Sequence, residues 1–116
     1  MAIVDVDPRK ETVREKIFIA VENCFGINEH ELKDKVKIRE ITNRRFIVWG
    51  VLADYGYSPS EIVEVFDGRF DRVTISKGIS QCELYIQHET QFRKRYLRLA
   101  DEMEKLTGFE AEGQAE

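Results

Sequence analysis

The basic residues in the middle of the chain have a spacing that suits phosphate binding. Lysine or arginine recurs at every second position from Lys33 to Arg39, and a basic pair follows at Arg44 and Arg45. Residues 33–77 contain nine Lys and Arg against seven Asp and Glu, a balance of +2 in a chain whose net charge is −4. Because phosphate attraction depends on local charge, this segment predicts a nucleic-acid contact despite the acidic total. A solvated surface without a ligand explains the same run almost as well.

Other kinds of chemistry find little support in the residue types. Cys24, Cys82, His30 and His88 are isolated, without C-x-x-C or H-x-x-x-H spacing, so we expect buried thiols, no disulfide, no metal and no cofactor. The sequence also lacks a G-x-x-x-x-G-K-[ST] segment for nucleotide phosphates. No nucleophile, base and orienting group come together in one motif, and we therefore expect no enzymatic activity.

Length and composition indicate one domain with one core. The chain has 116 residues, of which 42% are hydrophobic and 34% are charged, a composition too apolar for a disordered chain and too charged for a membrane protein. Its longest stretch without a charged residue, Phe46 to Ala53, has eight residues, whereas a membrane-spanning helix needs roughly 18. Residues 1–5 lack the features of a secretory signal, and we expect a cytoplasmic protein.

The spacing of apolar residues predicts an all-α fold of about six helices. We expect one domain over residues 1–108 and an acidic flexible tail over residues 109–116. Asp7-Pro8 begins a first helix that ends at Gly26, Asn28 begins a short second helix, and a third helix ends near Gly56. The apolar alternation over residues 3–6 has no partner strand elsewhere.

The next two expected helices have the layout of a helix-turn-helix. Ser58-Pro59-Ser60-Glu61 combines a capping box with proline at the first helical position, and this fourth helix runs to Phe66. After the Asp67-Gly68 stop, Asp71 caps a fifth helix. Its expected buried stripe consists of Ile75, Ile79, Cys82 and Ile86. In a helix-turn-helix the second helix presents its first turns to the major groove of DNA.

Three segments, taken in order, carry a resemblance to a known family. They are Glu31–Arg45, the pattern Ser58-x-x-Glu61-Ile62-x-x-x-Phe66-x-Gly68-Arg69, and Asp71-Arg72-Val73-Thr74-Ile75. Together they resemble the C-terminal DNA-binding domain of the bacterial replication initiator DnaA: its basic loop, its first helix-turn-helix element, and its Asp-His-Thr-Thr-Val signature. One extra residue, placed at Phe70, is needed for this alignment. The similarity extends from about Ile17 to Ile86.

The resemblance implies recognition of short duplex sites at a replication origin. It implies a recognition helix in the major groove, with Arg45 in the minor groove and the basic loop on the phosphate backbone. Lys77, one helical turn beyond Val73 and Thr74, is expected to face the same groove. The complete set of expected DNA-contacting residues is Lys33, Lys35, Lys37, Arg39, Arg45, Ser60, Arg69, Asp71, Arg72, Val73, Thr74 and Lys77.

Two signature positions differ from the family. Arg72 replaces the family's His and can pair with guanine, whereas Val73 replaces its first Thr and can contact only apolar groups such as a thymine methyl. These changes imply either a different preferred site or a loss of DNA binding. The leading hypothesis is a non-enzymatic helix-turn-helix protein that binds double-stranded DNA and regulates replication or transcription. The alternative is a protein-interaction module on the same fold.

Overall fold

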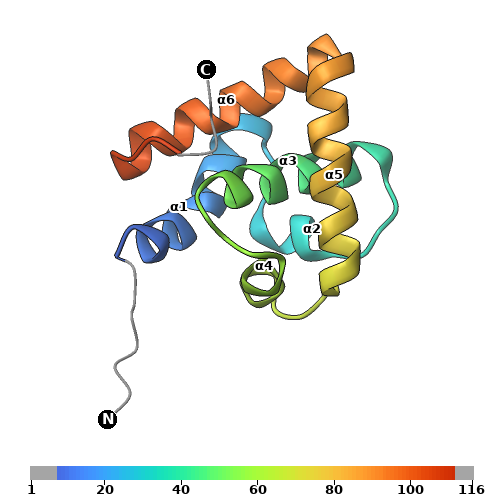
Figure 1. Ribbon diagram of the computed structural model, residues 1–116, viewed down its shortest axis with the longest axis horizontal. Coiled ribbons are helices and arrows are strands. Elements are labelled where there is room, and N and C mark those ends of the chain that lie inside the picture. Colours follow the sequence, from blue (N-terminus) through green and yellow to red (C-terminus); the bar gives the residue numbers. More distant parts are fainter. Residues whose placement is uncertain (1–7, 112–116) are drawn as a thin grey trace.

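The computed structural model describes residues 8–111, which form six helices and no strand (Figure 1). The helices are α1 (Pro8–Phe25), α2 (Glu29–Lys33), α3 (Arg39–Asp54), α4 (Pro59–Val65), α5 (Arg72–His88) and α6 (Thr90–Thr107). This confirms the predicted all-α class and the six helices. Residues 3–6 lie outside the described range. None of the helices in that range combines the length and apolar character that crossing a bilayer requires.

Three of the predicted helix starts are held by side-chain caps. Asn28 and Glu31 form a capping box at α2, in which the Asn28 side chain accepts a hydrogen bond from the Glu31 amide at 2.8 Å. Ser58 and Glu61 form another at α4, with distances of 3.2 and 2.8 Å. Asp71 caps α5 by accepting from the Thr74 amide at 2.7 Å. Each cap satisfies amide groups that the helix itself leaves unpaired, so these starts follow from local sequence.

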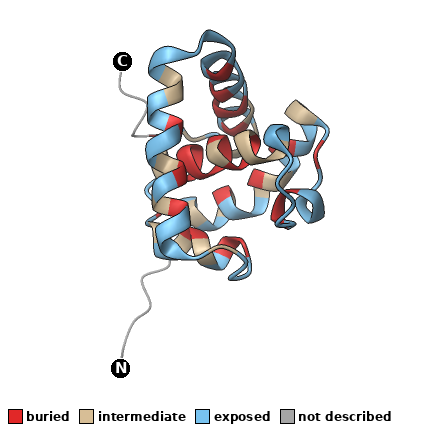
Figure 2. Ribbon diagram, turned by 90° about the vertical axis from the view of Figure 1, so that its right-hand side faces the viewer, coloured by how far each residue is buried: buried red, intermediate tan, exposed pale blue. Residues whose placement is uncertain are grey.

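The core is built around α3. All six residues from Ile47 to Leu52 are buried, so this helix is covered on every side, as expected for the central helix of a domain. Figure 2 shows the buried residues gathered in the interior and the exposed ones on the outer helix faces. Trp49 makes edge contacts with Phe66 and Phe70, at ring-centroid distances of 5.8 and 5.4 Å. These aromatic contacts join α3 to the segment that connects α4 and α5.

Two glycines allow α3 and α5 to approach closely. A Cβ atom at Gly78 would lie 2.3 Å from the Trp49 ring, and one at Gly50 would lie 2.5 Å from the Cys82 sulfur. The buried stripe of α5 therefore consists of Ile75, Gly78 and Cys82. The predicted stripe needs correction at Ile79 and Ile86, which are only partly buried, because α5 turns Gly78 toward Trp49.

The packed chain extends beyond the predicted domain end. Gly108 ends α6 in a left-handed conformation, with φ of 76°. Beyond it, the Tyr55 hydroxyl donates a hydrogen bond to the Phe109 carbonyl at 2.8 Å, and Ala111 is 5% exposed. Residues 109–111 therefore pack on the domain instead of forming the start of a flexible tail. The rest of the predicted tail, residues 112–116, lies outside the described range.

Candidate nucleic-acid interface

A tight turn joins α4 to α5. Asp67 and Gly68 both have left-handed backbone conformations, with φ of 56° and 71°, and the Gly68 amide donates to the Val63 carbonyl at 2.9 Å. Phe66 is fully buried, and its ring meets that of Phe70 at a centroid distance of 6.0 Å. The turn is thus anchored by aromatic packing on both sides of the glycine. The first turn of α5 follows directly and lies beside α4 (Figure 1).

The outer face of α5 is open from its first residue. Arg72, Val73, Thr74 and Lys77 all lie on the surface, and Val73 is 56% exposed. Further along, the same face continues as a shallow groove lined by Ser76, Lys77, Ser80, Gln81 and Leu84. This face carries basic, hydroxyl, amide and apolar groups, the side-chain chemistry that reads base edges and phosphates.

Basic side chains from two elements act on the start of α5. The pKa of Asp71 is lowered, first by the hydrogen bond from the Thr74 amide and further by the charges of Lys35 and Lys77. Lys35 belongs to the loop between α2 and α3, so this loop lies on the same side of the molecule as the first turns of α5. The Asp71 carboxylate accepts from the Thr74 amide as a helix cap, so it helps to position α5.

Arg45 lies inside the fold, contrary to its expected place in a DNA minor groove. Its side chain is 5% exposed, and its guanidinium donates to the Leu32 carbonyl at 2.8 Å, to the Val36 carbonyl at 3.2 Å and to the Asp34 carbonyl. Burial lowers the pKa of this guanidinium, and the Asp34 charge opposes that effect. The expectation is corrected for a physical reason: the donors of Arg45 are used by the end of α2 and the loop that follows.

Lys33 is a second basic residue used within the fold. It is 8% exposed, and its ammonium group lies 2.5 Å from a Glu29 oxygen and 2.7 Å from an Asp67 oxygen. Burial lowers the pKa of Lys33, but the hydrogen bonds to Asp67 and Glu29 outweigh it, and the net shift is upward. Lys33 therefore links α2 to the turn between α4 and α5, and the structure does not place it against a phosphate.

The Arg44–Arg45 pair as a whole belongs to the interior. Arg44 is 9% exposed and lies 4.8 Å from the centroid of the Phe25 ring. Burial lowers its pKa, as does the nearby charge of Arg95. The sequence places these two arginines in a basic surface segment, but in the structure they pack against neighbouring residues of the fold. For Arg45 the available signal was its spacing of four from Trp49, because residues four apart lie on the same face of a helix.

The remaining basic residues of the predicted site are exposed. They are Lys35, Lys37, Arg39, Arg69, Arg72 and Lys77, and none forms an ion pair with another residue of the described range. Ser60 lies in the first turn of α4. The prediction missed Val36 and Ile38, which are 38% and 55% exposed between the basic residues of the loop. Apolar residues at alternate positions of a polar loop were the available signal.

Residues 8–111 contain no group of three or more His, Cys, Asp or Glu that could hold a metal ion. Comparisons of the chain with protein-family models, curated proteins and solved structures find no match.

Proposed function

We propose that this chain binds double-stranded DNA, without enzymatic activity, through a helix-turn-helix formed by α4, the turn at Asp67-Gly68 and α5. The observation that carries the proposal is the placement of six exposed basic residues, without ion-pair partners in the described range, on the loop at 35–39, on the turn and on the first two turns of α5. Unpaired cations on a shared surface are what neutralisation of DNA phosphates requires. The resemblance to the C-terminal domain of replication initiators supports a role in replication or transcription control.

The exposed groups suit two kinds of contact with the duplex, to base edges and to phosphates. Arg72 stands at the start of α5, where it can donate two hydrogen bonds to a guanine edge in the major groove, and Val73 beside it suits a thymine methyl. Lys35 and Lys37 lie on the loop and Arg39 at the first position of α3, and all three suit phosphates on the flanking backbone. The proposal assigns no DNA contact to Lys33 or Arg45, since both are engaged inside the protein.

Selection of bound duplexes from a random pool, followed by electrophoretic shift titrations, tests the proposal. We expect an enriched sequence motif. Replacing Lys35, Lys37 and Arg39 together by alanine should weaken the shift strongly. The matched control replaces Lys94, Arg95 and Arg98, three exposed basic residues of α6, and should keep it. Equal losses in both variants would indicate attraction by charge alone, and failure of the wild-type chain to bind any duplex would overturn the proposal.

The alternative function, a protein-interaction module, is favoured by apolar exposure. Val36, Ile38, Val73 and Leu84 are between 38% and 56% exposed on the same loop and helix. An apolar protein interface is weakened little by salt, whereas DNA binding falls steeply with it. A chain that binds no duplex at low salt in the titrations above would favour the interaction module.

A further inference from the structure

The loop between α2 and α3 carries two apolar side chains that lie outside the core. Val36 is 38% exposed and Ile38 is 55% exposed. Ile38 is also the N-cap residue of α3, where it makes no side-chain hydrogen bond. Ser, Thr, Asp and Asn stabilise this position, and an isoleucine left in water gains little from burial. Ile38 therefore serves neither the helix start nor the core, which indicates a contact outside the chain.

Cations on both sides distinguish these residues from the other exposed apolar side chains. Lys35 and Lys37 flank Val36, and Lys37 and Arg39 flank Ile38. None of the three cations forms an ion pair with another residue between 8 and 111. The other large apolar side chains exposed in that range have at most one basic neighbour each: Ile19, Val73, Leu84 and Leu97. The charge around Val36 and Ile38 thus complements a polyanion such as the DNA backbone.

The loop is held in an extended form without a ligand. Asp34 and Ile38, at its two ends, have extended backbone conformations. The carbonyls of Asp34 and Val36 both accept from the Arg45 guanidinium, as expected where carbonyls two positions apart point to the same side of an extended chain. Arg45 also lies 4.9 Å from the centroid of the Phe70 ring, just before the cap of α5. The loop is therefore fixed beside the start of α5, and Figure 1 shows it at the margin of the molecule next to this helix.

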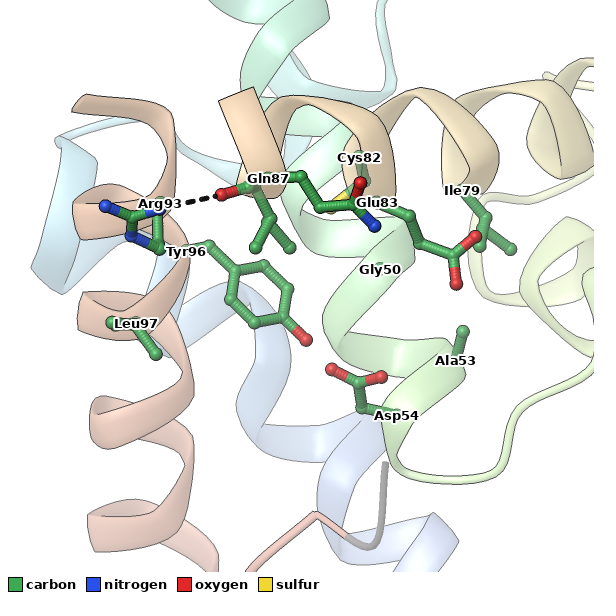
Figure 3. A pocket seen from close by; sticks show the side chains of 11 residues that line it. Gly50, Ala53, Asp54, Ile79, Cys82, Glu83, Gln87, Arg93, Tyr96 and Leu97 are labelled. Carbon is green, nitrogen blue, oxygen red and sulfur yellow. Dashed lines mark hydrogen bonds between the residues drawn. The ribbon is translucent and has the colours of Figure 1, made fainter. Parts of the chain in front are cut away.

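The two ends of α3 have opposite charges. The basic loop precedes its first residue, and a helix of 16 residues places the other end about 24 Å away. There Asp54, with Glu83 of α5, lies at a cavity of about 530 Å³ between α3, α5 and α6 (Figure 3). These two acids outnumber Arg93, the one basic residue among the described residues of the cavity lining. Phosphates are thus repelled from this end of α3 and attracted to the loop.

We propose that Ile38 is a wedge that inserts between two base pairs from the minor groove and kinks the duplex. This inference rests on the proposed DNA binding and adds the form of DNA that is preferred. Lys37 and Arg39 neutralise phosphates beside the inserted side chain, and Val36 packs on the neighbouring sugars. Aliphatic side chains of this kind partly unstack a base step, and pyrimidine–purine steps such as TA unstack most easily. The preferred duplex therefore has such a step next to the base pairs that α5 reads.

The experiment compares two forms of the duplex selected from the random pool, one with TATA and one with AAAA on both flanks of the site. Attraction by cations alone favours AAAA, because the narrow minor groove of an A-tract has the stronger negative potential. A wedge favours TATA, because A-tracts are stiff. We expect the full chain to bind the TATA form about tenfold more tightly. Energy transfer between dyes at the two duplex ends should rise, as for a bend of about 20° or more.

Variants of Ile38 separate a wedge from a structural role. Ile38→Ser removes the apolar side chain and supplies a capping hydroxyl, so the urea midpoint should not fall. The preference for TATA and the rise in energy transfer should both be lost. Ile38→Leu keeps a branched aliphatic side chain and should keep both effects. Ile19→Ser is the matched control, since Ile19 is 47% exposed on α1, and it should also keep both effects.

The outcomes distinguish this inference from the proposed function. If the wild-type chain binds no duplex, the proposed DNA binding fails and the wedge fails with it. If the chain binds the duplex but leaves it straight, or binds the AAAA form equally well or better, only the wedge is overturned, and Ile38 then belongs to the interaction-module alternative. A bend that persists in Ile38→Ser would also overturn the wedge, because another part of the protein would then cause it.

Discussion

The guanidinium of Arg45 lies 4.9 Å from the centroid of the Phe70 ring while its nitrogens bind the carbonyls of residues 32, 34 and 36. One side chain thus joins the basic loop after α2 to the residue immediately before the cap of α5. The ion pair between Lys33 and Asp67 makes a second connection between the same two parts of the chain. In the proposed DNA complex, these two buried cations set the spacing between the groups that reach the duplex.

The first prediction follows from this arrangement. Arg45→Ala removes three hydrogen bonds and leaves carbonyl groups without partners, so it should lower the free energy of unfolding by about 2 to 4 kcal/mol. Arg45→Lys should restore only part of this loss, because lysine lacks the planar fork of donors. Urea unfolding measures the stability, and amide hydrogen exchange should quicken at residues 34–38. DNA affinity should fall alike on all sequences. If Arg45→Ala instead lowered DNA affinity only for sites with A·T-rich flanks and left stability unchanged, Arg45 would be a minor-groove contact.

The second prediction concerns salt. If the exposed cations contact about five phosphates, log K should fall with log salt with a slope of roughly −4 to −5. The Lys35, Lys37 and Arg39 triple alanine variant, measured on the wild-type chain's preferred duplex at low salt, should reduce that slope by roughly 3. Lys94, Arg95 and Arg98 serve as the control with equal charge. A slope that does not change in the loop variant would remove the loop from the interface.

A third prediction separates base reading from backbone binding. Arg72→Ala should cost about 1 to 3 kcal/mol on the selected duplex and relax the preference at one base pair. Lys35→Ala should weaken all duplexes alike. Because both side chains are exposed, neither change should alter stability by more than about 0.5 kcal/mol. Titrations on the selected duplex, a one-base variant and an unrelated duplex test this, and equal losses on all three for Arg72→Ala would exclude base reading by this residue.

The fourth prediction concerns the crossing of α3 and α5. Alanine at Gly78 improves helix propensity by about 1 kcal/mol. The new Cβ would nevertheless stand 2.3 Å from the Trp49 ring, so Gly78→Ala should destabilise the fold by about 1 to 3 kcal/mol. Ile75→Ala, at a fully buried position, should cost about 2 to 5 kcal/mol, and Ile79→Ala about 1 kcal/mol because Ile79 is only partly buried. Chemical unfolding of the three variants measures their losses of stability. The largest loss for Ile79→Ala would contradict the packing of α5 described above.

Features encoded by neighbouring residues were predictable from sequence. The caps at Asn28, Ser58 and Asp71 each use a side chain and an amide three positions away, so the sequence motif contains the whole interaction. The six helices follow from such caps and from the spacing of apolar residues. The exposure of Arg72 and Thr74 in the first turn of α5 also follows, since both are polar and precede the first buried position, Ile75.

Features that depend on tertiary contacts were not predictable in the same way. Arg45 reads as a surface cation in sequence, but its partners are backbone carbonyls 9 to 13 positions away, which charge patterning does not reveal. Gly78 reads as a weak point in a helix, but it is the position at which Trp49 packs. Asp54 and Glu83 are 29 positions apart, and their shared cavity exists only because α3 and α5 cross closely at Gly50.

The last prediction concerns Asp54 and pH. Folding raises the pKa of this carboxyl from its ordinary 3.8 to about 6, by burial and then by the charge of Glu83. The folded state therefore holds the proton more tightly than the unfolded state, and this contribution to stability is complete below pH 3.8 and is lost as the pH rises through 6. The amide introduced by Asp54→Asn mimics the protonated carboxyl at every pH. Asp54→Asn should thus match the wild-type chain near pH 4 and exceed its stability at pH 7.5 by about 1 kcal/mol, once solvent screening of a partly exposed acid is included. Urea unfolding at both pH values tests this, with Glu15→Gln as the control that should show no pH-dependent difference. Equal stability of Asp54→Asn and wild type at pH 7.5 would mean that the carboxylate is already neutralised within the chain.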